Sequence, residues 1–132
     1  MGFFDKLKSV NTWKAGKKHA DNGNFEKALV YFDDAIRMAT DQKYLYEFRT
    51  WYYLTKAISC CKSDKLEDAN SSAINGLNEL QKFKDECVKT GSSLHFNMSY
   101  KAMMNFMDRY DNYFYIINEF NNLATFKEHL GQ

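Results

Sequence analysis

Proline is absent from this sequence of 132 residues, and glycine occurs only six times. Because these two residue types interrupt helices most strongly, their scarcity predicts helices along the whole chain. Long apolar runs are also missing, and a membrane-spanning helix needs about 20 apolar residues, so we expect no transmembrane segment. Asp5, Lys6 and Lys8 interrupt the first apolar residues, which argues against a secretory signal.

Cysteine is scarce too, with three in the chain. Cys60 and Cys61 are neighbours and Cys87 stands alone, which fits neither a disulfide framework nor the paired spacing of a zinc site. We therefore expect reduced thiols, no bound metal and a cytoplasmic location. Since adjacent positions of a helix point in different directions, one of Cys60 and Cys61 is expected to pack inside and the other to face away.

Motifs that indicate catalysis are missing as well. The sequence has no Gly-rich phosphate loop, no G-x-S-x-G motif and no Glu-x2-His pair of the di-iron bundles. Its net charge of +1 gives no overall attraction to nucleic acid, and no aromatic and glycine pattern accompanies the lysines. We expect a protein that is not an enzyme, binds no cofactor and has no nucleic-acid partner.

The sequence does contain a helix-turn-helix pattern over residues 11–40. Apolar residues recur every three or four positions from Phe25 to Ile36, which predicts one buried helical face. Gly23 fits the left-handed residue that ends a helix, and Asn24 is expected to cap the next one. Small residues stand where the two helices must touch, namely Gly16, Ala20, Ala28 and Ala35.

A second pair of helices is predicted over residues 41–62 and 66–89. Asp41 precedes the first of these helices and is its expected N-cap. Asp64, with Glu67 three positions later, predicts a capping box at the start of the second. This pair is expected to form another helical hairpin.

Both helix pairs carry small and aromatic residues at matching positions, and twelve positions separate Gly16 from Ala28 and Ala57 from Ala69. The matching runs are Gly16-x2-His19 with Ala28-x3-Phe32-x2-Ala35, and Ala57-x2-Cys60 with Ala69-x3-Ala73-x2-Gly76. This pattern resembles the tetratricopeptide repeat (TPR), a helical hairpin that must stack on its neighbours to bury its apolar face. The sequence departs from the family at three positions, namely Trp13, which is one position off the usual Trp, His19 in place of Tyr, and Thr40 in place of the closing Pro.

The resemblance implies an all-α fold of TPR-like antiparallel helical hairpins stacked in a right-handed superhelix, with a C-terminal aromatic capping helix or helix pair. Residues 1–132 would form a single domain. Its hairpin units would cover residues 11–40 and 41–89, and a degenerate third unit or cap would cover residues 92–130.

The concave groove of this family is lined by the first helix of each pair, here residues 11–22 and 41–62. It holds a peptide or helix of a partner, so the resemblance implies a protein-interaction module or scaffold. Some members grip a C-terminal carboxylate with Lys and Asn, but Trp13, Lys17 and Thr55 occupy those positions here. We therefore expect an apolar or amphipathic partner segment with some acidic residues. The candidate groove residues are Trp13, Lys17, Trp51, Thr55 and Ile58, with a basic edge of Lys6, Lys8, Lys14 and Lys18.

Two further regions leave other functions open. Residues 2–9 are predicted to form a short amphipathic helix, with Phe3, Phe4 and Leu7 on one side, that docks on the first hairpin or touches a membrane surface. The apolar run 113–117 favours burial inside the monomer, occupation of the molecule's own groove, or self-association as a homodimer, as in a structural protein or a small secretion-type chaperone. Three methionines are expected in the core rather than on an adaptable binding surface, namely Met103, Met104 and Met107.

Overall fold

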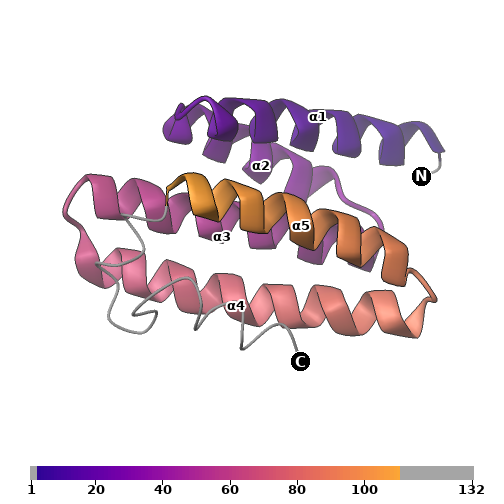
Figure 1. Ribbon diagram of the computed structural model, residues 1–132. Coiled ribbons are helices and arrows are strands. Elements are labelled where there is room, and N and C mark those ends of the chain that lie inside the picture. The colour runs from indigo at the N-terminus through magenta and orange to yellow at the C-terminus, as the bar shows by residue number, and fades with distance from the viewer. Residues whose placement is uncertain (1–2, 111–132) are drawn as a thin grey trace.

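The computed structural model describes residues 3–110, and within that range it contains five α-helices and no strand (Figure 1). The helices are α1 (Phe3–Asp21), α2 (Phe25–Met38), α3 (Gln42–Lys62), α4 (Leu66–Lys89) and α5 (Ser93–Arg109). The predicted all-α fold is confirmed for this part of the chain. The part of the expected third unit or cap (residues 92–130) that follows Tyr110, including the apolar run 113–117, lies outside the described residues. Within residues 3–110, no helix combines the length and the apolar character needed to cross a membrane.

Consecutive helices run antiparallel, and α1–α2 and α3–α4 are the two most closely packed pairs (Figure 1). Two glycines permit this approach: a Cβ on Gly16 would lie 2.8 Å from the Phe32 ring, and one on Gly76 would lie 3.1 Å from Leu54. The small residues expected between helices are all buried, which confirms their predicted place, and they are Gly16, Ala20, Ala28, Ala35, Ala57, Ala69, Ala73 and Gly76.

The predicted helix termini agree with the structure only in part. The helices expected over residues 2–9 and 11–22 are one helix, α1, because neither proline nor glycine separates them. Asp41 caps α3 as predicted, since its side chain accepts a hydrogen bond from the Lys43 backbone N–H at 3.0 Å. The capping box at Asp64 is wrong, because Asp64 adopts a left-handed φ of 59° and α4 begins one residue later than that cap requires.

Aromatic rings fill the centre of the molecule around Trp51, which is fully buried. Its ring lies against those of Trp13, Phe32 and Phe106, with centroid distances of 6.3, 6.2 and 5.4 Å. Rings packed at such distances contribute about 0.5–1.5 kcal/mol per pair beyond their buried area. The expectation that the methionines belong to the core is confirmed, since Met103, Met104 and Met107 are all buried.

The two adjacent cysteines of α3 correct another expectation. Both Cys60 and Cys61 are buried, with exposed fractions of 9% and 3%, so neither faces solvent. The reason is that α3 is covered on more than one side, by α2 and by α4. Neighbouring positions can therefore diverge in direction and still both be buried.

Helix α5 lies in front of α3, between α1 and α4 (Figure 1). At its C-terminal end, the Tyr110 hydroxyl donates to the Ala20 carbonyl at 3.2 Å and Arg109 donates to the Asp21 carbonyl at 2.9 Å. At its N-terminal end, α5 is bonded to α3 through the side chain of Glu47. Helix α5 therefore covers the face on which α1 and α3 adjoin, which is the face expected to be the partner groove.

Candidate functional site

Three of the five predicted groove residues lie in the core, where Trp51 packs against Phe106 of α5. Trp51, Thr55 and Ile58 have no exposed surface, so the structure corrects their expected role: they are core residues that a partner cannot contact in this structure. The physical reason is that the apolar face of α3, which the sequence pattern identified, is occupied by the chain's own fifth helix.

The other two, Trp13 and Lys17, are half-buried and line a cleft of about 280 Å³ between α1, α3 and α5. The Lys17 ammonium lies 5.7 Å from the ring centroid of Trp13 and 5.6 Å from that of Trp51. Both distances suit a cation–π contact, which is favourable by about 0.5–1 kcal/mol at an exposed site. The full lining is Val10, Trp13, Lys17, Tyr44, Glu47, His95, Met98, Ser99 and Ala102.

A buried carboxylate takes part in this lining. Glu47 is 2% exposed; it accepts a hydrogen bond from the Ser99 hydroxyl at 2.6 Å, and His95 Nε2 lies 2.9 Å from its other oxygen. Both of these groups come from α5, so Glu47 fastens α5 to α3. Burying a carboxylate is costly unless it is hydrogen-bonded in this way.

This trio does not form a catalytic relay. A Ser-His-acid triad requires the serine hydroxyl to bond to the histidine, which then bonds to the acid. Here Ser99 and His95 each bond to Glu47 instead. The arrangement therefore positions a helix and leaves no serine oriented for attack.

The phenol of Tyr44 stands beside the carboxylate. Burial, followed by the negative charges of Glu47 and Asp41, raises the pKa of Tyr44. The Tyr44 ring also meets the His95 ring edge-on, with 5.3 Å between centroids. The phenol therefore stays neutral at physiological pH and can donate a hydrogen bond in the cleft.

Two indole nitrogens and one hydroxyl on this face are buried without a hydrogen-bond partner among the described residues. They are Nε1 of Trp13, Nε1 of Trp51 and Oγ1 of Thr55. A buried polar group left unpaired costs about 1–3 kcal/mol. Helix α5 thus covers the face with apolar contacts but leaves these polar groups unpaired.

The predicted basic edge divides into two parts. Lys6 turns toward α3, with its ammonium 5.1 Å from the Tyr44 ring centroid. Lys8, Lys14 and Lys18 are exposed along α1. The edge is therefore basic as expected, although only these last three lysines stand free of α3.

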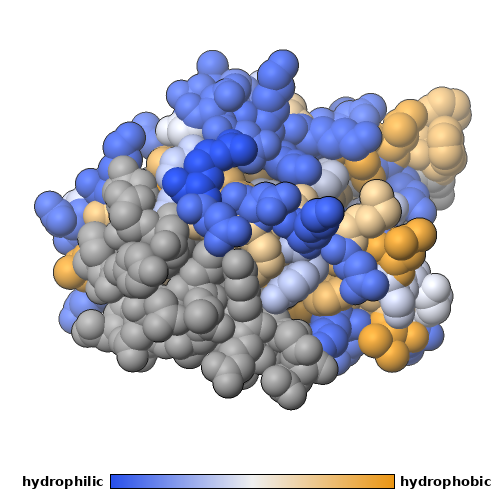
Figure 2. Space-filling view, in the orientation of Figure 1, coloured by the Kyte–Doolittle hydropathy of each residue, from blue (hydrophilic) through white to orange (hydrophobic). Residues whose placement is uncertain are grey.

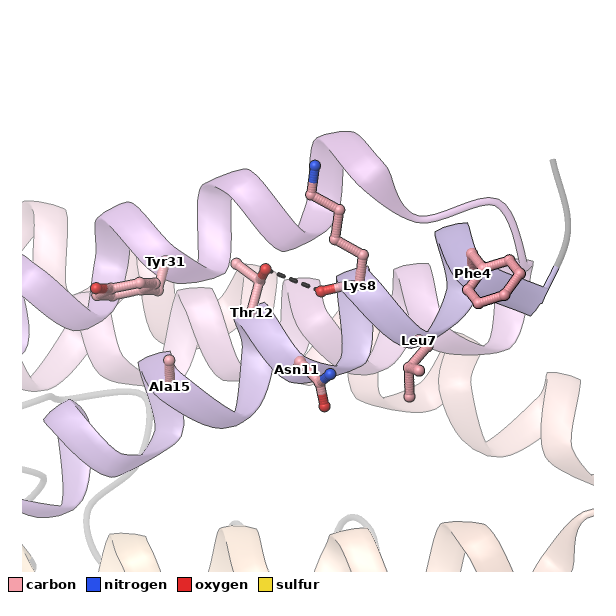
Figure 3. Close-up of a pocket in the computed structure, with 7 residues that line it drawn as sticks. All are labelled: Phe4, Leu7, Lys8, Asn11, Thr12, Ala15 and Tyr31. Atoms are coloured by element: carbon pink, nitrogen blue, oxygen red, sulfur yellow. Dashed lines mark hydrogen bonds between the residues drawn. The ribbon is translucent and has the colours of Figure 1, made fainter.

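A second hollow of about 430 Å³ lies on α1, lined by the seven residues drawn in Figure 3. Six of the seven come from α1, and Tyr31 from α2 forms the other wall. Phe3 and Phe4 at the start of this helix are 71% and 82% exposed. The expectation that they dock on the first hairpin is therefore wrong.

The cysteines offer no reactive or metal-binding centre within the described part of the chain. All three are free thiols, and no group of three His, Cys, Asp or Glu residues in residues 3–110 is placed to hold a metal ion. Burial raises the pKa of Cys61 and that of Cys87 to about 11. Because the thiolate is the reactive form, these two groups are inert near neutral pH.

The Glu47 contacts could not be predicted from the sequence. His95 lies 48 positions and Ser99 lies 52 positions from Glu47, so no local spacing links them. A single glutamate within an apolar helix face was the only available signal. Met98, exposed at the rim of the cleft, was missed for the same reason.

Compared with known proteins, this chain matches no protein-family model, no curated protein and no solved structure. Its function is therefore inferred from the geometry of the chain itself.

Proposed function

We propose that this protein is a TPR-like protein-interaction module that binds an amphipathic segment of a partner protein in the cleft between α1, α3 and α5. The observation that carries this proposal is the wall of that cleft, where the Trp13 indole and the Lys17 ammonium face Met98 and Ala102 of α5. Tryptophan is a favoured interface anchor because it buries a large area. Methionine adapts its shape to different apolar side chains.

The two hairpins support the TPR-like part of the proposal. Gly16 and Gly76 stand at tight helix contacts in α1 and α4. In such a fold, α1 and α3 would contribute the inner face, and α5 would narrow the groove to the cleft. A narrowed groove explains why Trp13 and Lys17 remain accessible while their neighbours on α3 do not.

The chemistry of the cleft defines the segment that fits it. Its volume of about 280 Å³ lies just below the usual range of about 300–1,000 Å³ for ligand pockets. It therefore accepts one or two anchoring side chains and not a whole peptide. Apolar anchors would pack on Trp13 and Met98, and an acidic residue would pair with Lys17.

A displayed library of random peptides, panned on the purified full chain, tests this proposal. We expect enrichment of peptides with apolar residues three or four positions apart and an acidic residue nearby. Trp13→Ala and Met98→Lys should each weaken the selected peptides about tenfold or more. Val30→Ser provides the matched control, since Val30 is 61% exposed on α2. Selected peptides that bind Trp13→Ala and Met98→Lys as tightly as the original chain would contradict the site.

A further inference from the structure

Large hydrophobic residues are exposed mainly at one end of the molecule, which we call the exposed end. It comprises the start of α1, the end of α4 and the start of α5. Figure 2 shows hydrophobic colour at this end and mostly hydrophilic colour over the upper part of the described surface. Six of the nine large hydrophobic residues exposed in the described part belong here, namely Phe3, Phe4, Leu7, Val88, Leu94 and Met98.

The beginning of α1 extends past its neighbours. Residues 3–8 are all exposed, and Ser9 is the first buried residue of the helix. Phe4, Leu94 and Phe3 have the largest exposed fractions at this end, 82%, 73% and 71%. An adjacent pair of phenylalanines so fully in solvent contributes nothing to the core, which points to contact with something else.

Positive charge accompanies these rings. Five lysines against one aspartate give residues 1–20 a net charge of +4, whereas the whole chain carries +1, so the remaining residues carry −3. Lys14 and Lys18 are one helical turn apart, a spacing at which like charges repel. Within the described residues, Lys8, Lys14 and Lys18 form no ion pair. Their charge is therefore available to an anionic surface.

The rings and the lysines share one side of α1. Phe4, Lys8, Asn11, Ala15 and Lys18 recur at steps of three and four, which places them along one face of a helix with 3.6 residues per turn. Figure 3 shows Phe4, Leu7, Asn11 and Ala15 along this helix, beside the hollow that they line. Four of the five residues on this face are exposed, and Ala15, beside Tyr31 of α2, is half-buried.

The cleft lies on the opposite side of the same helix. Trp13 stands nine positions after Phe4, which is two and a half turns at 3.6 residues per turn. A surface that binds the Phe4 side therefore leaves Trp13 and Lys17 accessible.

We propose that this side of α1 docks on an anionic lipid bilayer. Phe3, Phe4 and Leu7 enter the interface between headgroups and acyl chains, and Lys8, Lys14 and Lys18 contact anionic headgroups. A basic helix with exposed Phe and Leu has the composition of interfacial helices. A fluid, flat partner suits this surface better than a folded protein does, because the rings of Phe3 and Phe4 project from the first turn of one helix and are 71% and 82% exposed.

Vesicle co-sedimentation of the full chain tests the proposal. The vesicles contain phosphatidylcholine alone or with about 30% phosphatidylserine, which supplies the negative surface potential. We expect the original chain to bind the anionic vesicles about tenfold or more tightly than the neutral ones. Binding should fall steeply when salt rises from about 0.1 M to about 1 M, because the Debye length shortens from about 10 Å to about 3 Å.

Two variants separate the contributions of the rings and of the charges. The double variant Phe3→Ser/Phe4→Ser should bind anionic vesicles about tenfold more weakly or worse, since each ring removes a large apolar area from water. Lys14→Gln/Lys18→Gln should lower binding about 25-fold, at about fivefold per lysine. Val30→Ser and Lys27→Gln on α2 are the matched controls and should bind like the original chain.

The outcomes that would overturn the proposal are distinct. Absence of binding of the original chain to anionic vesicles overturns it outright. Equal binding by Phe3→Ser/Phe4→Ser overturns the insertion of the rings, and equal binding by Lys14→Gln/Lys18→Gln overturns the headgroup contact. If the original chain ignores vesicles but sediments as a dimer that the phenylalanine variant dissociates, the surface binds a second copy and not a membrane.

Discussion

The two ends of the helical bundle are built from the same helices but are covered very differently. At one end, which we call the capped end, Tyr110 donates to the carbonyls of Ala20 and Asp21, and its ring meets that of Phe25 edge-on at 5.0 Å. At the exposed end, Phe3 and Phe4 have no such cover. Helix α5 makes the difference, because its last turn closes the end of α1 while its first turn stops short of the start of α1.

Helix α5 is also held differently near the two ends. Toward the capped end it is held by rings, with Phe106 packed against Trp51 at 5.4 Å and Tyr110 against Phe25 at 5.0 Å. Toward the exposed end a ring contact, Phe96 against Phe83 at 5.3 Å, is joined by the polar bonds to the buried Glu47. This contrast separates the two ends: the capped end is closed by packed rings, and the exposed end carries the apolar surface that we propose docks on a bilayer.

The largest expected effect follows from removing a ring near the capped end. Phe106→Ala should lower the free energy of unfolding by about 3–5 kcal/mol, because Phe106 is 1% exposed and its loss leaves a cavity. Phe4→Ala, at the exposed end, should change it by no more than about 0.5 kcal/mol. Urea unfolding followed by circular dichroism measures both. Equal losses would show that the two ends are packed alike.

The next largest effect should follow from removing the polar attachment of α5 to α3. Glu47→Ala should lower the free energy of unfolding by about 1–3 kcal/mol, because it leaves the Ser99 hydroxyl and the His95 ring nitrogen without their partner. Hydrogen exchange should rise first in α5 residues close to the exposed end. A variant with unchanged exchange in α5 would show that the rings alone hold this helix.

The turns at the two ends should lose equal stability when their glycines are replaced by alanine. Gly23 and Gly91 have positive φ angles of 82° and 69°, a region that costs other residues about 1–2 kcal/mol. A Cβ at Gly23 would make only an ordinary contact with Tyr110 at 3.7 Å, and one at Gly91 would meet nothing within 4 Å. Gly23→Ala and Gly91→Ala should therefore cost the same amount in thermal or urea unfolding. Unequal losses of stability would show that the turns, and not α5, account for part of the difference between the two ends.

The smallest effect concerns two buried thiols, Cys61 toward the capped end and Cys87 toward the exposed end. Burial raises the pKa of each from 9.0 to about 11. The unfolded chain therefore releases these protons first, so stability is unaffected by the thiols below about pH 9 and falls as pH rises from 9 toward 11. Urea midpoints at several pH values measure this fall.

The matched controls for the thiols are Cys61→Ala and Cys87→Ala. Each should flatten the decline above pH 9, and a maleimide should label both cysteines slowly at pH 8 unless urea is present. Rapid labelling of Cys87 alone would show that the exposed end is loosely packed beneath its surface.

Local structure could be predicted from the sequence because it depends on neighbouring residues. The left-handed Gly23 ends α1 with the predicted turn, and Asp41 caps α3. Asp64 shows the limit of such reasoning, because a capping motif competes with the backbone conformation that the turn demands. At this turn the left-handed conformation of Asp64 prevails over the cap.

The candidate site was predicted only in part. Trp13 and Lys17 line a cleft, but Trp51, Thr55 and Ile58 are buried. An apolar helical face identifies residues that must be covered without identifying what covers them. Periodicity is identical for a face that receives a partner and for one that receives another helix of the same chain.

The sequence by itself determined the helical character of the chain, the two hairpins and the small residues between them, because these follow from spacings of three, four and twelve positions. The tertiary structure alone decided that α5 covers the α1–α3 face, that Glu47 meets His95 and Ser99, and that α1 begins beyond its neighbours. Those outcomes depend on contacts between residues some 48 to 90 positions apart. Such contacts depend on the shape and polarity of whole surfaces. A local sequence pattern carries no information about these surfaces.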